Sequence, residues 1–373
     1  GPPGVREVLG RLQGWEAPSG AWESWLLASR VANYDPAWLD ELFLSGEMMW
    51  GRLRVPKREE EDGPSSAAMT RTIPISLAFR EDLGWILPAE RLAAKEGRDA
   101  SQLFPQLRSG AQAVFEALKA RGALFFPELA KLTGLLPTQL EDAVRELAAV
   151  GLVTSDALAA VRAIVAGAKE AKRRSRYRDA PKRAAAGGRW SLFPGMVDAA
   201  PRAEALDRWC RLLMARYGVL FRDLLTRESA APAWYELVPV LRRLERRGEI
   251  RGGRFVSGVA GEQYASEEAV QRLREVREDQ ADEPWVLISA ADPLNLVGIV
   301  TLGEKIPATH KNVLAFHRGK CVATRIAKQI AFVEEPPPEL RTEIERALRW
   351  GPLRGDGKHR RKRPGEDGAL GVA

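Results

Sequence analysis

Residues 202–258, RAEALDRWCRLLMARYGVLFRDLLTRESAAPAWYELVPVLRRLERRGEIRGGRFVSG, predict three helices followed by a short hairpin. The first helix is expected over 202–217, because apolar residues recur on one stripe and Gly218 follows as a left-handed cap. A short helix over 222–226 and a third helix over 233–247 come next. This order of elements is typical of a winged-helix unit.

The third helix of this unit is strongly basic. Its arginines lie off the apolar stripe that faces the core, and two further arginines flank the glycine pair Gly252-Gly253, where a tight hairpin turn is expected. The third helix and the wing of such units can dock on duplex DNA, although winged helices also serve as protein-docking or spacer modules. The candidate nucleic-acid-binding residues are Arg242, Arg243, Arg246, Arg247, Arg251 and Arg254.

The first 110 residues predict a unit of the same kind. Helices are expected at 5–13, 19–31 and 35–46. The third of them begins at Asp35-Pro36, where Asp caps the helix and Pro occupies its first turn. Strands over 48–55 and 72–79 flank an acidic loop that contains Glu59-Glu60-Glu61-Asp62, so this unit is expected to carry a long wing.

Residues 111–168 predict a middle unit with helices at 111–121, 127–132 and 137–150. The segment 120–129 parallels 215–224 after a shift of one residue, which indicates tandem units of one architecture. Acidic residues outnumber basic ones in the middle unit's third helix. Only the last unit therefore offers a basic third helix.

After a helix over 266–277, the apolar period changes from helical to alternating. Short β-rich runs predict a small antiparallel barrel, and a last helix is expected over 339–350. The predicted fold class is α+β, with tandem winged-helix modules followed by a small antiparallel β-barrel. The expected parts are a first module at 1–110, a second at 111–168, a basic linker at 169–200, a third module at 201–280, a barrel at 281–335, and a helix with a basic disordered tail at 336–373.

The net charge of +7 is unevenly distributed along the 373 residues. Segment 169–190 carries nine Lys or Arg against two acids, and segment 354–364 carries six against one. Such runs are either solvated, disordered charge or contacts to phosphates, and composition does not choose between the two. Under the second interpretation Arg173, Arg174 and Arg176 are further candidate nucleic-acid-binding residues.

Several classes of protein are excluded or disfavoured by the sequence. No run of eighteen apolar residues is present, so no membrane partner is expected. The two cysteines, Cys210 and Cys321, fit a reducing cytoplasm, which is the predicted location. His310 and His317 lack nearby ligand partners, so no metal site is expected. The opening Gly1-Pro2 without an initiator Met predicts a piece of a longer protein.

The order of these repeats, with the segments LQGWEAPSGAWESWLLASRVANYDPAWLDELFLSGEMMWGRL, GALFFPEL, GRWSLFPG, RYGVLFRDLL, QYAS and SAADPLN, resembles the C-terminal region of Lhr, the large helicase-related proteins. The resemblance implies a superfamily-2 DNA repair helicase whose motor domains lie upstream. ATP and Mg²⁺ are expected only in those domains, and no cofactor is expected here, because the chain has no phosphate-binding loop. The partners implied are DNA or an RNA:DNA hybrid and the upstream helicase domains.

The same region is similar in domain order to AlkZ/YcaQ-type DNA glycosylases. The place of their Gln-x-Gln pair, which positions a water, is expected to be held here by Glu16-Ala17-Pro18. Glu16 is a candidate water-activating carboxylate, against a role in capping the second helix. Asp292 is a second candidate catalytic carboxylate, against an Asx turn before Pro293.

Three functional hypotheses follow. The preferred one is a nucleic-acid-binding accessory region of an Lhr-type ATP-dependent DNA repair helicase. The second is a DNA glycosylase that flips uracil or an alkylated base out of the stack. The third is an oligomerisation module that joins Lhr chains into a homo-oligomer through winged-helix faces.

Overall fold

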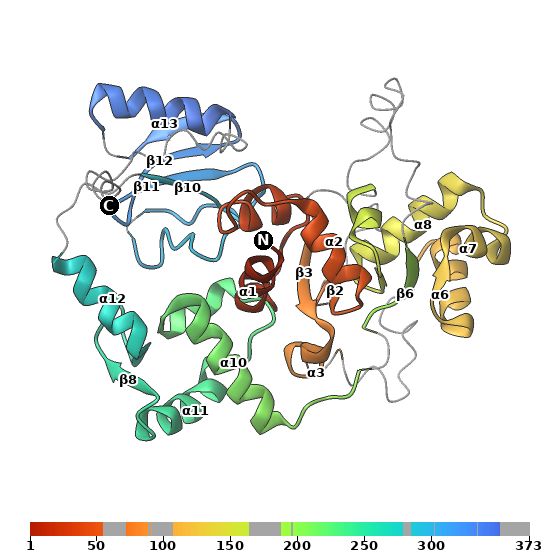
Figure 1. Ribbon diagram of the computed structural model, residues 1–373, viewed down its shortest axis with the longest axis horizontal. Helices are drawn as coiled ribbons and strands as arrows, with labels where there is room; N and C mark the ends of the chain where they lie inside the picture. The colour runs from red at the N-terminus through yellow and green to blue at the C-terminus, as the bar shows by residue number, and fades with distance from the viewer. Residues whose placement is uncertain are drawn as a thin grey trace, which may run out of the picture.

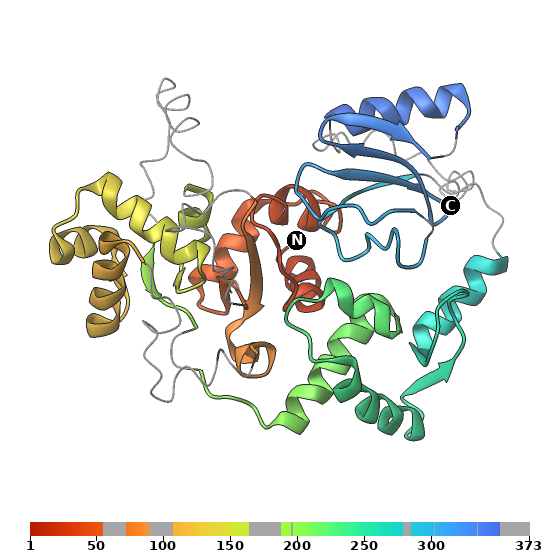
Figure 2. The same cartoon turned by 180° about the vertical axis from the view of Figure 1, so that it is seen from behind.

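The computed structural model describes residues 1–54, 72–88, 91, 107–163, 188–194, 197–278, 285–301, 303–333 and 335–350. These residues form three three-stranded antiparallel sheets and one four-stranded antiparallel sheet, each with its own helices. The unit with α1 and α2 lies between the unit with α6 to α8 and the rest of the chain (Figure 1). The four-stranded sheet and its covering helix lie at one end, as the view from behind also shows (Figure 2).

The stretch 202–258 begins the third winged-helix module. Its elements are α10 (Arg202–Tyr217), β7 (Val219–Leu220), the 3-10 helix η4 (Arg222–Arg227), α11 (Trp234–Arg246), β8 (Ile250–Gly253), β9 (Gln263–Ser266) and α12 (Glu267–Glu278). The strand order is β7-β9-β8. The helices expected over 202–217 and 233–247 are therefore confirmed to within one residue at each end.

The hairpin turn expected at Gly252-Gly253 is wrong. Both glycines belong to β8, where they pair with the start of β9, and the connection is the longer loop 254–262. The buried side chain of Gln263 organises this loop, because its Oε1 accepts from the Val256 amide (2.8 Å) while its Nε2 donates to the Val256 carbonyl (2.9 Å). A polar side chain from the neighbouring strand thus replaces the tight turn.

The first module repeats the same topology with the strand order β1-β3-β2. Its elements are α1 (Pro2–Leu12), β1 (Ala17–Pro18), the π-helix η1 (Trp22–Leu27), α2 (Pro36–Leu44), β2 (Met48–Gly51), β3 (Pro74–Phe79), the 3-10 helix η2 (Arg80–Asp82) and α3 (Leu83–Ile86). Asp35 caps α2 as predicted, since its Oδ1 accepts from the Ala37 amide (2.9 Å). The acidic wing at 59–62 lies outside the described residues.

The helix expected over 19–31 is only the π-helix η1. Two tryptophans three positions apart are held by different neighbours in this segment. The Trp22 indole N–H donates to the Ile75 carbonyl (3.0 Å), whereas Trp25 packs against the core of the four-stranded sheet. The wider turn of a π-helix allows Trp22 and Trp25 to make both sets of contacts. Tertiary contacts therefore override the α-helical spacing of the sequence.

The second module has the strand order β4-β6-β5. Its elements are α6 (Ser109–Arg121), β4 (Leu124–Phe125), α7 (Phe126–Thr133), α8 (Pro137–Ala149), β5 (Val153–Ser155) and β6 (Arg189–Leu192). The central strand β6 falls in the segment that the sequence analysis assigned to a linker. The basic segment that begins at residue 169 therefore leads into a strand of this module, and Arg173, Arg174 and Arg176 lie outside the described residues.

Pairs of tryptophans join the modules. Trp50 and Trp190 meet edge to face at 6.1 Å between ring centroids, inside one core shared by the first and second modules. Trp85 and Trp209 do the same at 5.8 Å, inside a second core shared by the first and third modules. Trp50 of the first module thus also stabilises the boundary with the second module.

The predicted β-barrel is wrong. The described residues of this region form an open sheet of order β10-β11-β12-β13, comprising β10 (Val286–Ser289), β11 (Val313–His317), β12 (Lys320–Ile326) and β13 (Gln329–Phe332). One of the short β-rich runs, 296–300, lies in a loop with an isolated bridge between Val297 and Thr301. Helix α13 (Pro338–Trp350) covers the sheet by burying Ile344 and Leu348, so closure of a barrel is unnecessary.

None of the helices among the described residues is long and apolar enough to cross a membrane.

Candidate nucleic-acid interface

Helix α11 and the wing strand β8 place the predicted arginines on one side of the third module. The helix buries Leu237, Val240, Leu241 and Leu244 against α10 and the sheet, so residues between these positions face outward. All of the six arginines are exposed except Arg243, which is half-buried. The six residues therefore belong to the third helix and the wing of one module, and five of them are exposed.

Carboxylates neutralise much of this face. The guanidinium of Arg242 contacts Glu262 (Nε–Oε1, 3.1 Å), and Arg251 contacts Glu267 (Nη2–Oε1, 3.0 Å). Among the described residues, Arg246 and Arg254 form no ion pair. Sequence reasoning missed these pairs because the carboxylates lie far from their arginines in the chain. Glu262, just before β9, is 20 positions from Arg242, and Glu267, at the start of α12, is 16 positions from Arg251.

Asp207 of α10 holds the half-buried end of the cluster. It accepts from Arg211 (2.8 Å) and from Arg243 (3.2 Å), and Arg211 also pairs with Glu249 (2.8 Å). Partial burial opposes ionisation of Asp207, but the hydrogen bonds from Arg211 and Arg243 outweigh it and lower the pKa of Asp207. Arg243 is therefore a brace between α10 and α11, and is less available to a ligand than Arg246 or Arg254.

Glu16 lies where the first and third modules meet. Its Oε1 accepts from the Leu53 amide (2.7 Å), and its Oε2 accepts from the Ser229 hydroxyl (2.7 Å). The side chain thus bonds two segments that are distant in sequence, rather than the start of the second helix that it was expected to cap. Each oxygen retains a lone pair, and the residue is only partly buried, so it can still accept from a water.

Two arginines share the surroundings of Glu16. Arg52 donates to the Ala149 carbonyl (2.6 Å), and Arg91 donates to the Arg52 carbonyl (3.2 Å), so both engage carbonyls at the boundary with α8. Burial lowers the pKa of Arg91 to about 10, with the charge of Glu16 opposing the shift, and burial also lowers the pKa of Arg52. The surroundings of Glu16 are therefore cationic.

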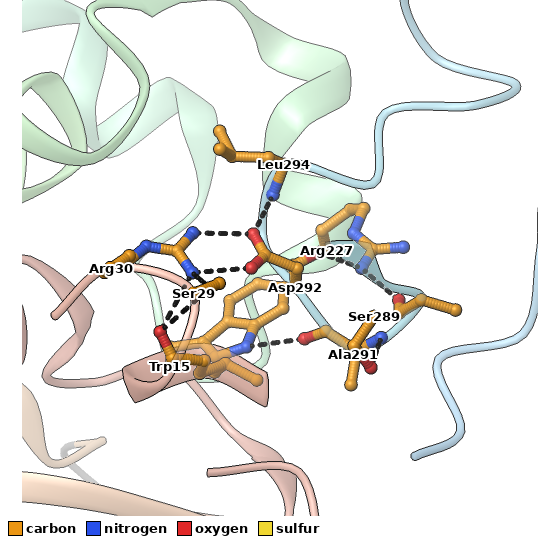
Figure 3. Close-up of polar contacts among 10 residues, drawn as sticks. Trp15, Ser29, Arg30, Arg227, Ser289, Ala291, Asp292 and Leu294 are labelled. Carbon is orange, nitrogen blue, oxygen red and sulfur yellow. Dashed lines mark hydrogen bonds and ion pairs between the residues drawn. The ribbon is translucent and has the colours of Figure 1, made fainter. Parts of the chain in front are cut away.

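Asp292 is nearly inaccessible and fully engaged. Arg30 grips it with two parallel hydrogen bonds, Nη1–Oδ2 at 2.7 Å and Nη2–Oδ1 at 2.8 Å, and the Leu294 amide donates to Oδ1 at 2.9 Å (Figure 3). Arg227 adds a bond from its Nη2 to the Asp292 carbonyl (3.1 Å). This geometry joins the loop after β10 to the first and third modules, and it includes the Asx turn that the sequence offered as the alternative to catalysis.

Replacing Asp292 with Asn is expected to destabilise the protein by about 2–3 kcal/mol. The amide of Asn has one oxygen that can accept from the Arg30 guanidinium, whereas the carboxylate has two, and its NH2 group would face the second guanidinium N–H. Urea unfolding followed by tryptophan fluorescence measures the loss. Asp142→Asn is the matched control, since Asp142 is 66% exposed in its pair with Arg145 and should cost less than about 1 kcal/mol. Equal losses for the two variants would contradict a structural role for Asp292.

Trp15 is the centre of the same junction. Its indole N–H donates to the Ala291 carbonyl (3.1 Å), and the guanidinium carbons of Arg216 and Arg227 lie 6.0 and 5.5 Å from its ring centroid. Figure 3 shows the indole beneath the Arg30–Asp292 pair, pointing toward Ala291. One side chain of the first module thus contacts both the third module and the loop that leads from β10.

A cavity of about 510 Å³ opens elsewhere, between the first and second modules. Its lining includes the basic residues Arg80 and Lys119 and the acidic residues Glu81 and Asp198. None of the sequence-predicted site residues lines it. Among the residues that the structure describes, no group of three His, Cys, Asp or Glu side chains is arranged to hold a metal ion.

Comparison with known families identifies two of the modules. Residues 1–66 and residues 199–285 each match a family model described as large helicase-related protein, winged-helix domain. Both segments are thus similar to winged-helix domains of large helicase-related proteins, which confirms the resemblance noted in the sequence.

Two curated relatives extend the similarity beyond the matched domains. A Mycolicibacterium smegmatis protein described as Lhr helicase/probable uracil glycosylase is 29% identical over 321 residues, covering 80% of this chain. An Escherichia coli K12 protein described as Lhr helicase/uracil glycosylase is 26% identical over 335 residues, covering 83% of this chain. The chain spans about a fifth of the length of both relatives, since each alignment covers 20% of the relative.

Among solved structures, the DNA glycosylase AlkZ of Streptomyces sahachiroi is similar with a TM-score of 0.48 and 14% identity. The match covers 93% of this chain and 90% of that chain.

Proposed function

We propose that this chain is the nucleic-acid-binding accessory region of an Lhr-type DNA repair helicase. The observation that carries the proposal is the outward arginine face of α11 and β8, on a domain that matches the large helicase-related winged-helix model. A winged helix presents these two elements to duplex DNA, and guanidinium groups on them reach phosphates or base edges. DNA, or an RNA:DNA hybrid, is the proposed ligand.

The motor chemistry is assigned to other parts of the longer protein. The chain has no G-x-x-x-x-G-K-[ST] segment, so ATP and Mg²⁺ binding are proposed to belong to upstream domains. In this proposal the accessory region holds the duplex or strand on which the motor acts. Its own contribution is affinity and position, supplied by phosphate contacts whose strength depends on salt.

Replacing both Arg246 and Arg247 with Ala is expected to weaken DNA binding on the order of tenfold to hundredfold at about 0.1 M salt. The slope of log affinity against log salt should fall by about two, because each lost phosphate contact removes about 0.9 from it. Fluorescence anisotropy with a labelled mixed-sequence duplex, titrated at several salt concentrations, measures both quantities.

The matched control removes two exposed cations from the second module, as Arg121→Ala with Lys131→Ala. These residues lie on α6 and α7, away from the proposed face, so the affinity and the slope should stay close to the parent values. An unchanged slope in the Arg246/Arg247 variant, or an equal loss in the control, would remove the support for this face.

A second candidate function is base release, because both relatives carry uracil glycosylase in their names and Glu16 sits partly exposed at a junction of modules. The two hydrogen bonds fix the position of the Glu16 carboxylate, and its remaining lone pairs can accept from a water, which is the geometry that general-base action requires. The test incubates the chain with duplexes containing uracil or alkylated bases and scores alkali-labile sites. Loss of such sites in Glu16→Gln, with retained DNA binding, would assign Glu16 as the base, while an absence of sites for the parent chain would exclude the function.

A further inference from the structure

We propose that Glu262 and Glu267 act as intramolecular competitors of phosphate on the arginine face of the third module. The inference rests on the proposed function and concerns how that site selects its ligand. Together with Arg242 and Arg251, the two glutamates form ion pairs across the wing. Duplex DNA must exchange these carboxylates for its own phosphates before the two arginines can contact it.

The position of the two glutamates is set by the fold of the wing. Glu262 directly precedes β9 and Glu267 directly follows it, so β9 carries one carboxylate at each end. Because β9 pairs with β8, Glu267 is brought beside Arg251, whose Nη2 lies 3.0 Å from its Oε1. Glu262 is brought beside α11, where the Nε of Arg242 lies 3.1 Å from its Oε1.

Both pairs are open to solvent and therefore exchangeable. The side chains of Arg242 and Glu262 are 58% and 43% exposed, and those of Arg251 and Glu267 are 55% and 63% exposed. Exposed ion pairs of this kind contribute little to folding stability. A phosphate with three or more acceptor sites and its counterion atmosphere can replace a carboxylate there at small cost, so the pairs regulate binding more than they hold the fold.

The other acidic residues near these arginines differ from Glu262 and Glu267, because each has a further partner that holds it in the fold. Glu245 accepts a hydrogen bond from the Gly252 amide (3.1 Å). Asp207 and Glu249 are tied to Arg211 of α10. Only Glu262 and Glu267 bind arginines of this face without a second structural bond among the described residues.

The consequence is a face with few unpaired cations. Arg246 and Arg254 are available for a first contact, whereas Arg242 and Arg251 become available only when a ligand displaces their glutamates. The affinity for ligands that make weak, non-specific phosphate contacts is thereby lowered relative to the affinity for a ligand that displaces both glutamates at once. The negative charges of the two glutamates also repel the phosphates of a duplex that does not displace them.

The test replaces Glu262 and Glu267 with Gln in the full chain and measures affinity for a mixed-sequence duplex at several salt concentrations. The expected result is an affinity gain of about tenfold or more at low salt, with a slope steeper by about two, because two more arginines engage phosphates. Glu339→Gln with Glu343→Gln, two exposed residues of α13, changes the net charge by the same amount and should leave both quantities close to the parent values.

Two outcomes would overturn the inference. The first is an unchanged affinity and slope in the Glu262/Glu267 variant while Arg246→Ala with Arg247→Ala still weakens binding, which would leave the proposed function intact. The second is an equal gain in the α13 control, which would assign the effect to net charge. A loss of response in both the arginine and the glutamate variants would instead contradict the proposed function itself.

Discussion

Replacing Arg216 with Leu is expected to destabilise the protein by about 3–5 kcal/mol, because it leaves the carboxylate of Glu228 buried without its partner. The pair is almost inaccessible, with side-chain exposures of 1% and 0%. Arg216 also donates from Nε to the Arg11 carbonyl (2.9 Å) and from Nη2 to the Gln13 carbonyl (2.5 Å), at the end of α1. The substitution therefore removes two hydrogen bonds between the first and third modules together with one ion pair inside the third module.

Urea unfolding measured by circular dichroism and by tryptophan fluorescence reports this loss. Arg11→Leu serves as the control, because its pair with Glu7 is exposed at 60% and 68% and should contribute only about 0.3–0.5 kcal/mol. If the two signals separate in Arg216→Leu and coincide in the parent, the substitution has uncoupled the modules. A loss below about 1 kcal/mol would contradict a structural role for the buried Arg216–Glu228 pair and for the contacts of Arg216 with the end of α1.

Replacing Trp15 with Ala is expected to cost a similar amount, about 3–5 kcal/mol, since a side chain only 3% exposed leaves a cavity between three parts of the chain. The variant also leaves the Ala291 carbonyl without its donor and removes the ring on which Arg216 and Arg227 lie. Trp15→Phe keeps a six-membered aromatic ring and leaves a smaller cavity, so it should lose less than Trp15→Ala, with about 1–2 kcal/mol of its loss due to the missing hydrogen bond.

Chemical denaturation and limited proteolysis of the loop after β10 distinguish the two variants of Trp15. Cleavage there should accelerate in Trp15→Ala, because the loop loses its contact with the first module. Leu44→Ala is the control, since Leu44 is 74% exposed and should change stability by no more than about 0.5 kcal/mol. Equal stability of Trp15→Ala and the parent would show that the indole is dispensable to the junction.

The junction between modules bears on the proposed nucleic-acid-binding role. Arg216 and Trp15 connect the first and third modules, and the Arg30–Asp292 pair connects the first module to the loop after β10. Arg242 and Arg246 of α11 are exposed and take no part in these contacts. A rigid support limits the conformational entropy that binding must overcome. The stability variants and the DNA-binding variants are therefore expected to report on separate surfaces, which makes their effects additive to a first approximation.

The sequence by itself determined the local elements of this protein. Apolar periodicity, the Asp35-Pro36 cap and the glycine after Tyr217 placed α2 and α10, because capping and amphipathic spacing act over a few residues. The repeated order of helices and wing strands also predicted winged-helix modules, which the matches at 1–66 and 199–285 confirm. The basic face of α11 was readable for the same reason, since its residues are close neighbours on one helix.

Only the tertiary structure decided how distant segments pair. The strand β6 completes a sheet with β4 and β5 across a long charged segment, and the last sheet stays open because α13 covers it. Both features depend on contacts between residues that are far apart in the chain. The entropic cost of closing the loops between those residues cannot be inferred from a local sequence pattern. The same reason hid the carboxylates opposite Arg242 and Arg251, as well as the engagement of Glu16 by Ser229. Local sequence patterns predicted the winged-helix type of the modules. Which arginines on the surface remain without an ion-pair partner depends instead on the carboxylates that the tertiary structure places next to them.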